Sequence, residues 1–497
     1  MKSRTLACIA AVTVFAVPLI QLRLVAQNNQ VHNDGQKHHH YKLIDIGTFG
    51  GPNSYFTFVS QTLNRHGAAT GSADTSEVLN PPFCLIDCFV THAFEWKDGI
   101  MTDLGALPGI GASFPNDIND RGVVAGISLN GGFDPALGLP YFDGIVVKDG
   151  EVIDLGTFGG PLSYSASISE RDEVVGFALN STPDSFDLGT LCQNFPMPTQ
   201  MHAFIWRDGI MRDLGTLGGT DSCALFVNQR GQAAGVSFTD TIVNTNTGRP
   251  TIHPFVWDGK EMVDLGTLGG TIAVASAIND RGQVAGASTL PGDLAWDVFT
   301  WERGRLTDQG NLGGNFIEVV GFNEVGEVVG RALLPDQVTY HAFLVKEGVM
   351  MDLGTQGGNP CSYAVQINLK EQIVGYSDDC GGNNSRAFLW EKGLMTDLNA
   401  FVPSGSGVTL TQGISINDRG EITTQGVIPN GDQRGFLLTP CYEHHGDDQG
   451  CEEGGGENAV LPTNPAPPAE PRGTLPPSLR RRMSLYRFPG SAFGPKN

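Results

Sequence analysis

The stretch DLGTLGGTIAVASAINDRGQVAGASTLPGDLAWDVFTWERGRLTD, residues 264–308, is the clearest copy of a unit that recurs along the whole chain. Intervals of 44 to 59 residues separate successive copies. Self-similarity of this kind is typical of repeat architectures, in which each copy forms one supersecondary unit. The Asp that opens the unit recurs at eight positions: Asp45, Asp103, Asp154, Asp213, Asp264, Asp308, Asp352 and Asp397.

Each copy predicts four short β-strands. The first ends in an apolar residue and an Asn, and the N-D-R-G turn that follows (279–282) suits Asn and Asp side chains and a Gly with positive φ. A V-V-G segment (328–330) forms the second strand. The third has the form H-A-F-x-W, which places Phe and Trp on one face. A short D-G or K-G turn then leads to the fourth strand.

Four-stranded units of this length fit the blades of a β-propeller. The last copy contains only three strands, at 411–417, 421–426 and 435–438, and its missing fourth strand has a match at 42–45. Donation of that segment closes the ring and removes its exposed edges. We therefore predict an all-β propeller of eight four-stranded blades over residues 41–441. Seven blades plus an atypical unit is the second interpretation.

The repeat resembles the HAF repeat family, named for its strand-three triplet. The matches are DLGTLGG (213–219, 264–270), INDRG (118–122, 278–282, 416–420) and HAF (92–94, 202–204, 341–343), and they span about residues 41 to 440. This resemblance implies an extracellular location and carries no activity. A weaker likeness to kelch propellers rests on the Gly-Gly pair and the later aromatic residues. The last copy departs from the pattern, since DLNAFVPSG (397–405) lacks the double Gly.

The N-terminus predicts export. Lys2 and Arg4 precede an uncharged apolar run at 6–20, which is shorter than the roughly 20 residues of a membrane span. We predict a signal peptide at 1–26, with an uncleaved anchor as the alternative, a flexible segment at 27–40 and a disordered Gly/Pro-rich tail with a basic end at 442–497. The net charge of −22 argues against nucleic-acid partners. We expect a monomer that is secreted or at the cell surface, with the periplasm as a further possibility, and no membrane span after signal removal.

Eight cysteines follow Cys8, an even number that predicts disulfides in an exported chain. In a four-stranded meander, the connections between strands two and three share one face of the ring with the links between blades. On this basis we predict Cys192–Cys223 and Cys361–Cys380, which leaves Cys84–Cys88 and Cys441–Cys451 as disulfides that close local loops.

The same topology indicates where a ligand would bind. Connections between strands two and three are long in the first four units, at 72–91, 128–141, 178–201 and 237–252, so one face is elaborated. Loop drift without function is the alternative. Trp296 is added because it falls outside the register of the other tryptophans, which predicts a place in a loop. The predicted ligand contacts are Phe133, Asp134, Tyr141, Asp184, Phe186, Asp187 and Trp296.

The repeated Asp and the His of H-A-F are interpreted as structural, with calcium as the one cofactor considered and no catalytic or metal-binding residue assigned. The predicted function is an extracellular binding module for a glycan or a protein. The alternatives are a secreted propeller hydrolase or lyase that acts on polysaccharide, and a structural cell-surface protein without a ligand.

Overall fold

The computed structural model describes residues 40–57, 61–79, 88–135, 138–193, 196–245 and 247–441, all within one compact unit. The predicted signal peptide (1–26), the predicted flexible segment apart from His40, and the predicted tail (442–497) lie outside the described residues.

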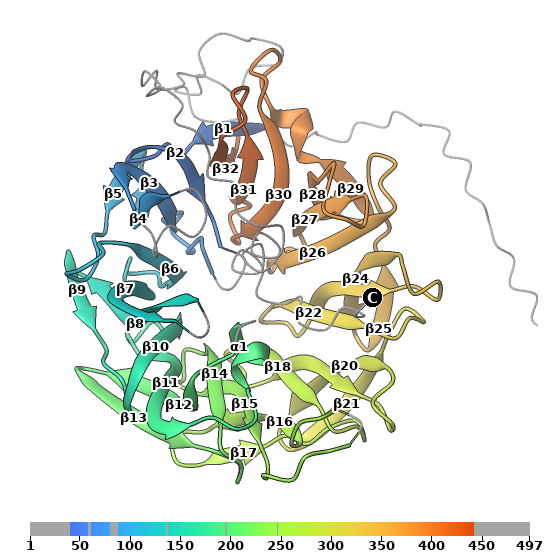
Figure 1. Cartoon of the computed structure of the whole chain (residues 1–497). Helices are drawn as coiled ribbons and strands as arrows, with labels where there is room; N and C mark the ends of the chain where they lie inside the picture. Colours follow the sequence, from blue (N-terminus) through green and yellow to red (C-terminus); the bar gives the residue numbers. More distant parts are fainter. Residues whose placement is uncertain are drawn as a thin grey trace, which may run out of the picture. The chain divides into compact units, whose positions relative to one another are not determined.

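The described chain forms eight four-stranded antiparallel sheets arranged in a ring, so it is an eight-bladed β-propeller (Figure 1). Blades 1 to 4 are β2 (Gly50–Tyr55), β3 (Ala69–Val78), β4 (Phe89–Lys97) and β5 (Ile100–Asp103); β6 (Ser113–Ile118), β7 (Val124–Asp134), β8 (Leu139–Lys148) and β9 (Glu151–Asp154); β10 (Gly159–Ile168), β11 (Val174–Pro183), β12 (Thr199–Arg207) and β13 (Ile210–Gly215); and β14 (Ser222–Val227), β15 (Ala233–Phe238), β16 (Ile252–Trp257) and β17 (Met262–Asp264).

Blades 5 to 7 are β18 (Ala273–Ile278), β19 (Val284–Thr289), β20 (Trp296–Glu302) and β21 (Arg305–Gly310); β22 (Ile317–Phe322), β23 (Val328–Leu333), β24 (Tyr340–Lys346) and β25 (Val349–Asp352); and β26 (Cys361–Ile367), β27 (Ile373–Asp378), β28 (Arg386–Glu391) and β29 (Leu394–Asp397). Blade 8 combines β30 (Thr409–Ile416), β31 (Ile422–Val427) and β32 (Gln433–Pro440) with β1 (Tyr41–Asp45). Two short helices, α1 (Gly189–Gln193) and η1 (Leu398–Phe401), lie in connections.

The ring closes as predicted, because β1 is the outermost strand of blade 8. It pairs antiparallel with β32 from Tyr41 opposite Pro440 to Asp45 opposite Phe436. Alternate side chains of β1 pack into different cores. Leu43 joins a cluster formed by blades 7 and 8, whereas Ile44 joins one formed by blades 8 and 1. One short strand therefore completes a sheet and seals two inter-blade boundaries.

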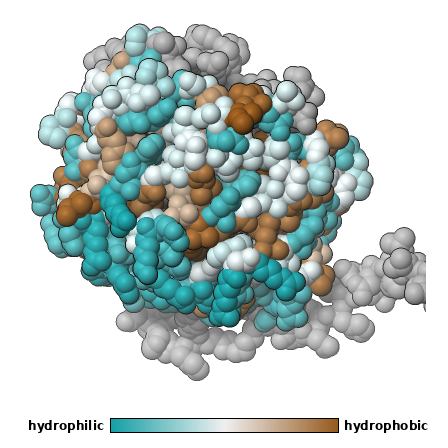
Figure 2. All heavy atoms as spheres, turned by 90° about the horizontal axis from the view of Figure 1, so that it is seen from below, coloured by the Kyte–Doolittle hydropathy of each residue, from teal (hydrophilic) through white to brown (hydrophobic). Residues whose placement is uncertain are grey.

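The blade interiors explain two repeated residues. The Phe of strand three is fully buried in seven blades. The Gly of strand two leaves no room for a side chain, since a Cβ at Gly330 would lie 1.9 Å from the carbonyl oxygen of Glu318 and 3.1 Å from Phe343. On the outside, where alternate residues of a strand face solvent, hydrophobic residues lie in groups between hydrophilic ones (Figure 2).

An asparagine ladder connects the blades at the turn between strands one and two. The Oδ1 of each ladder Asn accepts N–H groups two and four residues on, and its Nδ2 donates to a carbonyl oxygen of the next blade. The bond from Asn417 to Asn64 O (3.1 Å) crosses the closure. Blade 3 has Ser169 at this position, which has no amide to donate. The ladder residues are Asn64, Asn119, Asn228, Asn279, Asn323, Asn368 and Asn417.

We expect Ile44→Pro to lower the free energy of unfolding by about 3 kcal/mol, because proline has no N–H to donate to β32. Residue pairs in an antiparallel sheet alternate between hydrogen-bonded and non-hydrogen-bonded. Since the Ile46 N–H donates to Gly435 O (3.0 Å), Ile44 and Leu437 also form a hydrogen-bonded pair. Urea unfolding measures the effect, and Ile44→Val, with an expected loss of about 1 kcal/mol, is the control. Equal losses in both variants would show that backbone pairing of β1 does not hold the ring closed.

We expect Asn368→Ser to lower the free energy of unfolding by about 1 to 2 kcal/mol, because it removes the buried Nδ2 that donates to Asn417 O (2.9 Å). The serine hydroxyl can still accept the backbone N–H groups of the turn, as Ser169 does in blade 3. The matched control is Ser169→Asn, which supplies the amide that blade 3 lacks and should cost nothing. Thermal unfolding of both variants tests the ladder, and a harmless Asn368→Ser would contradict it.

Candidate functional site

The repeated Asp of D-L-G accepts a backbone N–H two residues on in every blade, at 2.7 to 2.9 Å. In blades 1, 3, 4 and 6, the His of strand three also places Nδ1 2.8 to 2.9 Å from this carboxylate. In blade 7, Arg386 Nε takes that place opposite Asp397 (2.8 Å). The repeated Asp therefore holds the fourth strand and the link that follows it, as its structural interpretation predicts.

Two of the predicted disulfides form, Cys192–Cys223 and Cys361–Cys380. Each joins a connection between strands two and three to the first strand of a blade, so these connections and the inter-blade links do share one face. We call it the loop face. Cys88 and Cys441 are also disulfide-bonded. Their predicted partners, Cys84 and Cys451, lie outside the described residues.

The loop face is built more from strands than the sequence predicts. The segments 72–91 and 128–141, expected to be loops, largely continue as strands, since β3 runs to Val78, β4 begins at Phe89, β7 runs to Asp134 and β8 begins at Leu139. Pairing satisfies backbone groups that an open loop would leave to water. The long connection of blade 3 contains α1, which lies near the middle of the ring in Figure 1.

Three of the predicted ligand contacts share the β7–β8 hairpin of blade 2. Phe133 pairs with Pro140, and the Tyr141 hydroxyl donates to Asp134 Oδ2 at 3.2 Å. Asp134 is buried, whereas Phe133 and Tyr141 are half-buried. Burial and the neighbouring Asp134 raise the pKa of Tyr141, so its hydroxyl stays protonated at neutral pH.

Three more lie in the connection before α1 in blade 3. The carboxylate of Asp184 accepts the N–H groups of Phe186 and Asp187, both at 2.9 Å. Asp187 in turn accepts the N–H of Thr190 at 3.1 Å, and the Phe186 ring packs edge-on against Phe238. These residues fix the shape of the connection while remaining half-buried.

The prediction that Trp296 lies in a loop is wrong. It is the first residue of β20, pairs with Thr289 and is 9 % exposed. The connection before it is short, so the strand begins early enough to include the indole in the core. The structure thus groups six of the seven predicted residues into two neighbouring connections and places Trp296 apart from them in blade 5.

Sequence reasoning missed a charged cluster between blades 6 and 7. Arg331 of β23 donates to Glu318 of β22 at 2.8 Å, and its guanidinium lies over the rings of Tyr340 (4.8 Å) and Tyr363 (4.5 Å). The exposed fractions of the two charged side chains are only 17 % and 10 %. Burial of an ion pair costs free energy, because both charges lose their hydration. An ion pair in which both side chains are this deeply buried is therefore an unusual feature of a blade.

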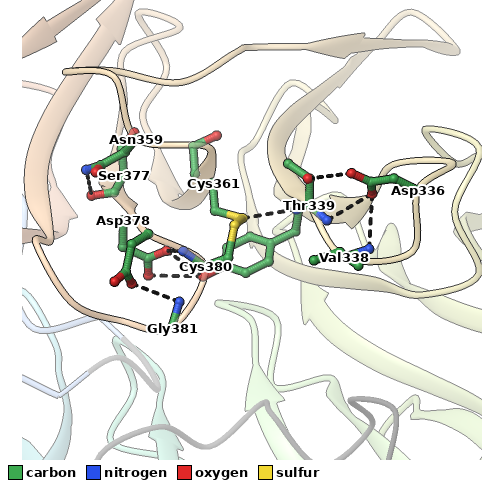
Figure 3. The surroundings of a disulfide bond; sticks show 12 residues. Asp336, Val338, Thr339, Asn359, Cys361, Ser377, Asp378, Cys380 and Gly381 are labelled. Carbon is green, nitrogen blue, oxygen red and sulfur yellow. Dashed lines mark hydrogen bonds between the residues drawn. A yellow bond between two sulfur atoms is a disulfide. The ribbon is translucent and has the colours of Figure 1, made fainter.

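The cluster borders the Cys361–Cys380 disulfide, whose surroundings are shown in Figure 3. The Tyr340 N–H donates to Cys361 Sγ (3.3 Å), and its hydroxyl donates to Asp378 (2.9 Å), which also accepts the Cys380 N–H (2.7 Å). Burial raises the pKa values of Tyr340 and Tyr363. These hydroxyls are therefore hydrogen-bond donors rather than bases, and the cluster fastens blade 6 to blade 7.

One signal in the sequence could have found this cluster. Arg331 follows the Gly of V-V-G, and it is the only charged residue at that position of strand two. The seven other blades carry uncharged residues there: Ser72, Ile127, Phe177, Val236, Ala287, Tyr376 and Gln425.

Three carboxyl groups have strongly raised pKa values, and burial is the main cause in each. The pKa of Asp117 rises to about 7, and those of Asp143 and Asp221 rise to about 6. They lie on strand one of blade 2, on strand three of blade 2 and beside strand one of blade 4. Asp117 accepts hydrogen bonds from Ser167 Oγ (2.8 Å) and Ile168 N–H (2.9 Å) of the next blade. It thus connects blades 2 and 3.

Asp117 predicts a pH-dependent stability. Its pKa is raised from 3.8 to about 7, so the folded chain holds a proton that the unfolded chain releases in this range, and stability falls as the pH rises through it. Asp117→Asn should flatten this decline and gain on the order of 1 kcal/mol at about pH 8. An amide oxygen fits there, because Gln366 accepts the N–H of Ile416 (2.7 Å) in the same way. Urea unfolding across pH measures both effects, and identical pH profiles would contradict them.

No family model and no curated protein matches the chain. Among solved structures, it is similar to the β-propeller domain of the Trilobed protease from Pyrococcus furiosus, with 8 % identity, 70 % of this chain and 95 % of that chain covered, and a TM-score of 0.42. It is also similar to dipeptidyl peptidase 4 from Porphyromonas gingivalis, with 9 % identity, 78 % of this chain and 59 % of that chain covered, and a TM-score of 0.45. A third similar structure is TolB from Acinetobacter baumannii, with 12 % identity, 55 % of this chain and 65 % of that chain covered, and a TM-score of 0.29.

Proposed function

We propose that this propeller is an extracellular binding module that holds a neutral glycan on the loop face. The observation that carries the proposal is the concentration of long connections from blades 1 to 4 on that face. Strand pairing, the backbone N–H groups that Asp184 and Asp187 accept, and the Cys192–Cys223 disulfide hold the described parts of these connections in place. A surface fixed before binding loses less conformational entropy when a ligand arrives.

The chemistry of the half-buried side chains in these two connections selects the ligand class. The rings of Phe133 and Tyr141 can stack on the apolar face of a sugar, and the carboxylates of Asp184 and Asp187 can accept hydrogen bonds from its hydroxyl groups. Acidic side chains at these positions repel an anionic sugar. These properties favour a glycan without acidic groups over an acidic one.

The disulfides support the proposed location, because they form and persist in oxidising compartments such as the cell exterior or the periplasm. The signal peptide predicted at 1–26 agrees with export. Over the described residues, no helix combines the length and the apolar character that a membrane span requires.

Calorimetric titration of the full chain with neutral hexasaccharides of xylan, cellulose and laminarin tests the proposal. At least one should bind, and Phe133→Ala should weaken that binding about tenfold through loss of stacking area. The control is Ile210→Ala, which removes an exposed apolar side chain from the outer strand β13. The absence of binding at about 1 mM of every hexasaccharide, or equal affinity of Phe133→Ala and the native chain, would overturn the proposal.

A further inference from the structure

The face opposite the loop face carries a pocket of about 480 Å³ between blades 4 and 5. We call it the arginine pocket. Its volume falls in the range of small-molecule sites. It lies where the turns between strands one and two meet the hairpins between strands three and four. The lining residues are Arg230, Gln232, Arg281, Gly282, Trp301, Glu302 and Arg303.

The repeat itself brings two of the guanidinium groups together. Arg230 and Arg281 occupy the same position of the turn between strands one and two, which reads N-Q-R-G at 228–231 and N-D-R-G at 279–282. The ladder bond from Asn228 to Asn279 O (2.9 Å) connects these two turns. Arg230 Nη1 also donates to the carbonyl oxygen of Arg281 at 3.3 Å. Both turns are therefore held in place before any ligand binds.

Only some of the equivalent arginines in other blades are paired. Arg121 and Arg419, at the same turn position, form ion pairs with Asp172 and Glu421, whereas Arg171 of blade 3 forms none within the described residues. Over the described ranges, neither Arg230 nor Arg281 has a carboxylate within ion-pair distance. Their positive charge therefore stays available within a chain whose net charge is −22.

Two neighbouring acids do not fill the pocket. Glu324 is near enough to be stabilised by both guanidinium groups, but its carboxylate accepts the N–H of Asp280 at 3.0 Å. Glu302 accepts a hydrogen bond from Gln283 Nε2 at 3.0 Å, and its contact with Arg303 is long, at 3.8 Å. Arg303 is 91 % exposed, so its guanidinium can turn toward a ligand.

Trp301 gives the pocket an aromatic wall. The other tryptophans at this strand-three position, in blades 1, 3, 4 and 7, are 6 to 7 % exposed, whereas Trp301 is only partly buried and lines the pocket. In blade 4, Arg212 lies over the equivalent ring of Trp257 at 5.1 Å. An indole beside unpaired guanidinium groups combines a stacking surface with donors for a carboxylate.

We propose that the arginine pocket binds a uronic-acid unit of an acidic polysaccharide. Arg230 and Arg281 hold the sugar carboxylate through charge-assisted hydrogen bonds, Trp301 stacks on the sugar ring and Gln232 bonds its hydroxyl groups. This site lies on the other face from the proposed neutral-glycan site and does not depend on it. Because the whole molecule is acidic, the pocket suits one or two uronate units rather than a long polyanion.

Calorimetric titration of the full chain with trigalacturonate tests this proposal. Trigalacturonate should bind, whereas its methyl ester, which keeps the sugar rings without the charge, should bind at least about tenfold more weakly. Arg281→Ala and Trp301→Ala should each lower the affinity for trigalacturonate about tenfold. The charge-matched control is Arg305→Ala, an exposed residue that does not line the pocket and should leave the affinity unchanged.

Several outcomes would refute the proposal: no binding at about 1 mM, equal affinity for the methyl ester, citrate that binds as tightly as trigalacturonate, or affinity unchanged in Arg281→Ala. Should Trp301→Ala fail to fold, the exposed Arg230→Ala takes its place, with the same expected loss. Phe133→Ala separates the two sites, because it should weaken neutral-glycan binding and leave trigalacturonate binding intact.

Discussion

The pairing of β1 with β32 is the constraint on which the other features depend. Each blade packs against two neighbours, so a ring with one incomplete sheet would expose both an unpaired strand edge and two apolar surfaces. Residues 41–45 cover all three at once, because Leu43 and Ile44 point into different inter-blade cores. The ladder bond from Asn417 to Asn64 reinforces the same boundary. The two faces, and any ligand sites on them, exist only once this boundary is sealed.

Comparison of the repeats separates residues that build the common blade structure from residues that are peculiar to one blade. Recurring residues satisfy backbone groups or fill the core: the Asp of D-L-G is present in every blade, and the buried Phe of strand three in seven of the eight. Individual properties arise where one blade departs from the others: the long connections of blades 1 to 4, the Arg331 cluster between blades 6 and 7, and the partly exposed Trp301 in blade 5.

The sequence allowed the blade number, the closing strand and two disulfides to be predicted, because all three follow from counting strands and from which connections share a face. Features that depend on the neighbouring blade could not be obtained in this way. No pattern within one blade reveals that the guanidinium of Arg331 in blade 6 lies over the ring of Tyr363 in blade 7. The start of β20 at Trp296 is missed for another reason, because the connection before it is shorter than the sequence pattern predicts. The arginine pocket combines residues from two blades, and the sequence shows only that Arg230 and Arg281 are repeat equivalents.

Closure by β1 also sets an order of events during biosynthesis. Residues 41–45 leave the ribosome before any blade, yet their partner strand, Gln433–Pro440, leaves after all of the others. The contact between β1 and β32 therefore has a very large sequence separation, and β1 stays unpaired until its partner has been synthesised. Proteins of this topology depend on slow, late long-range pairing and on protection of that edge in the meantime. The ring therefore cannot be complete until synthesis has passed β32, whichever blades have formed by then.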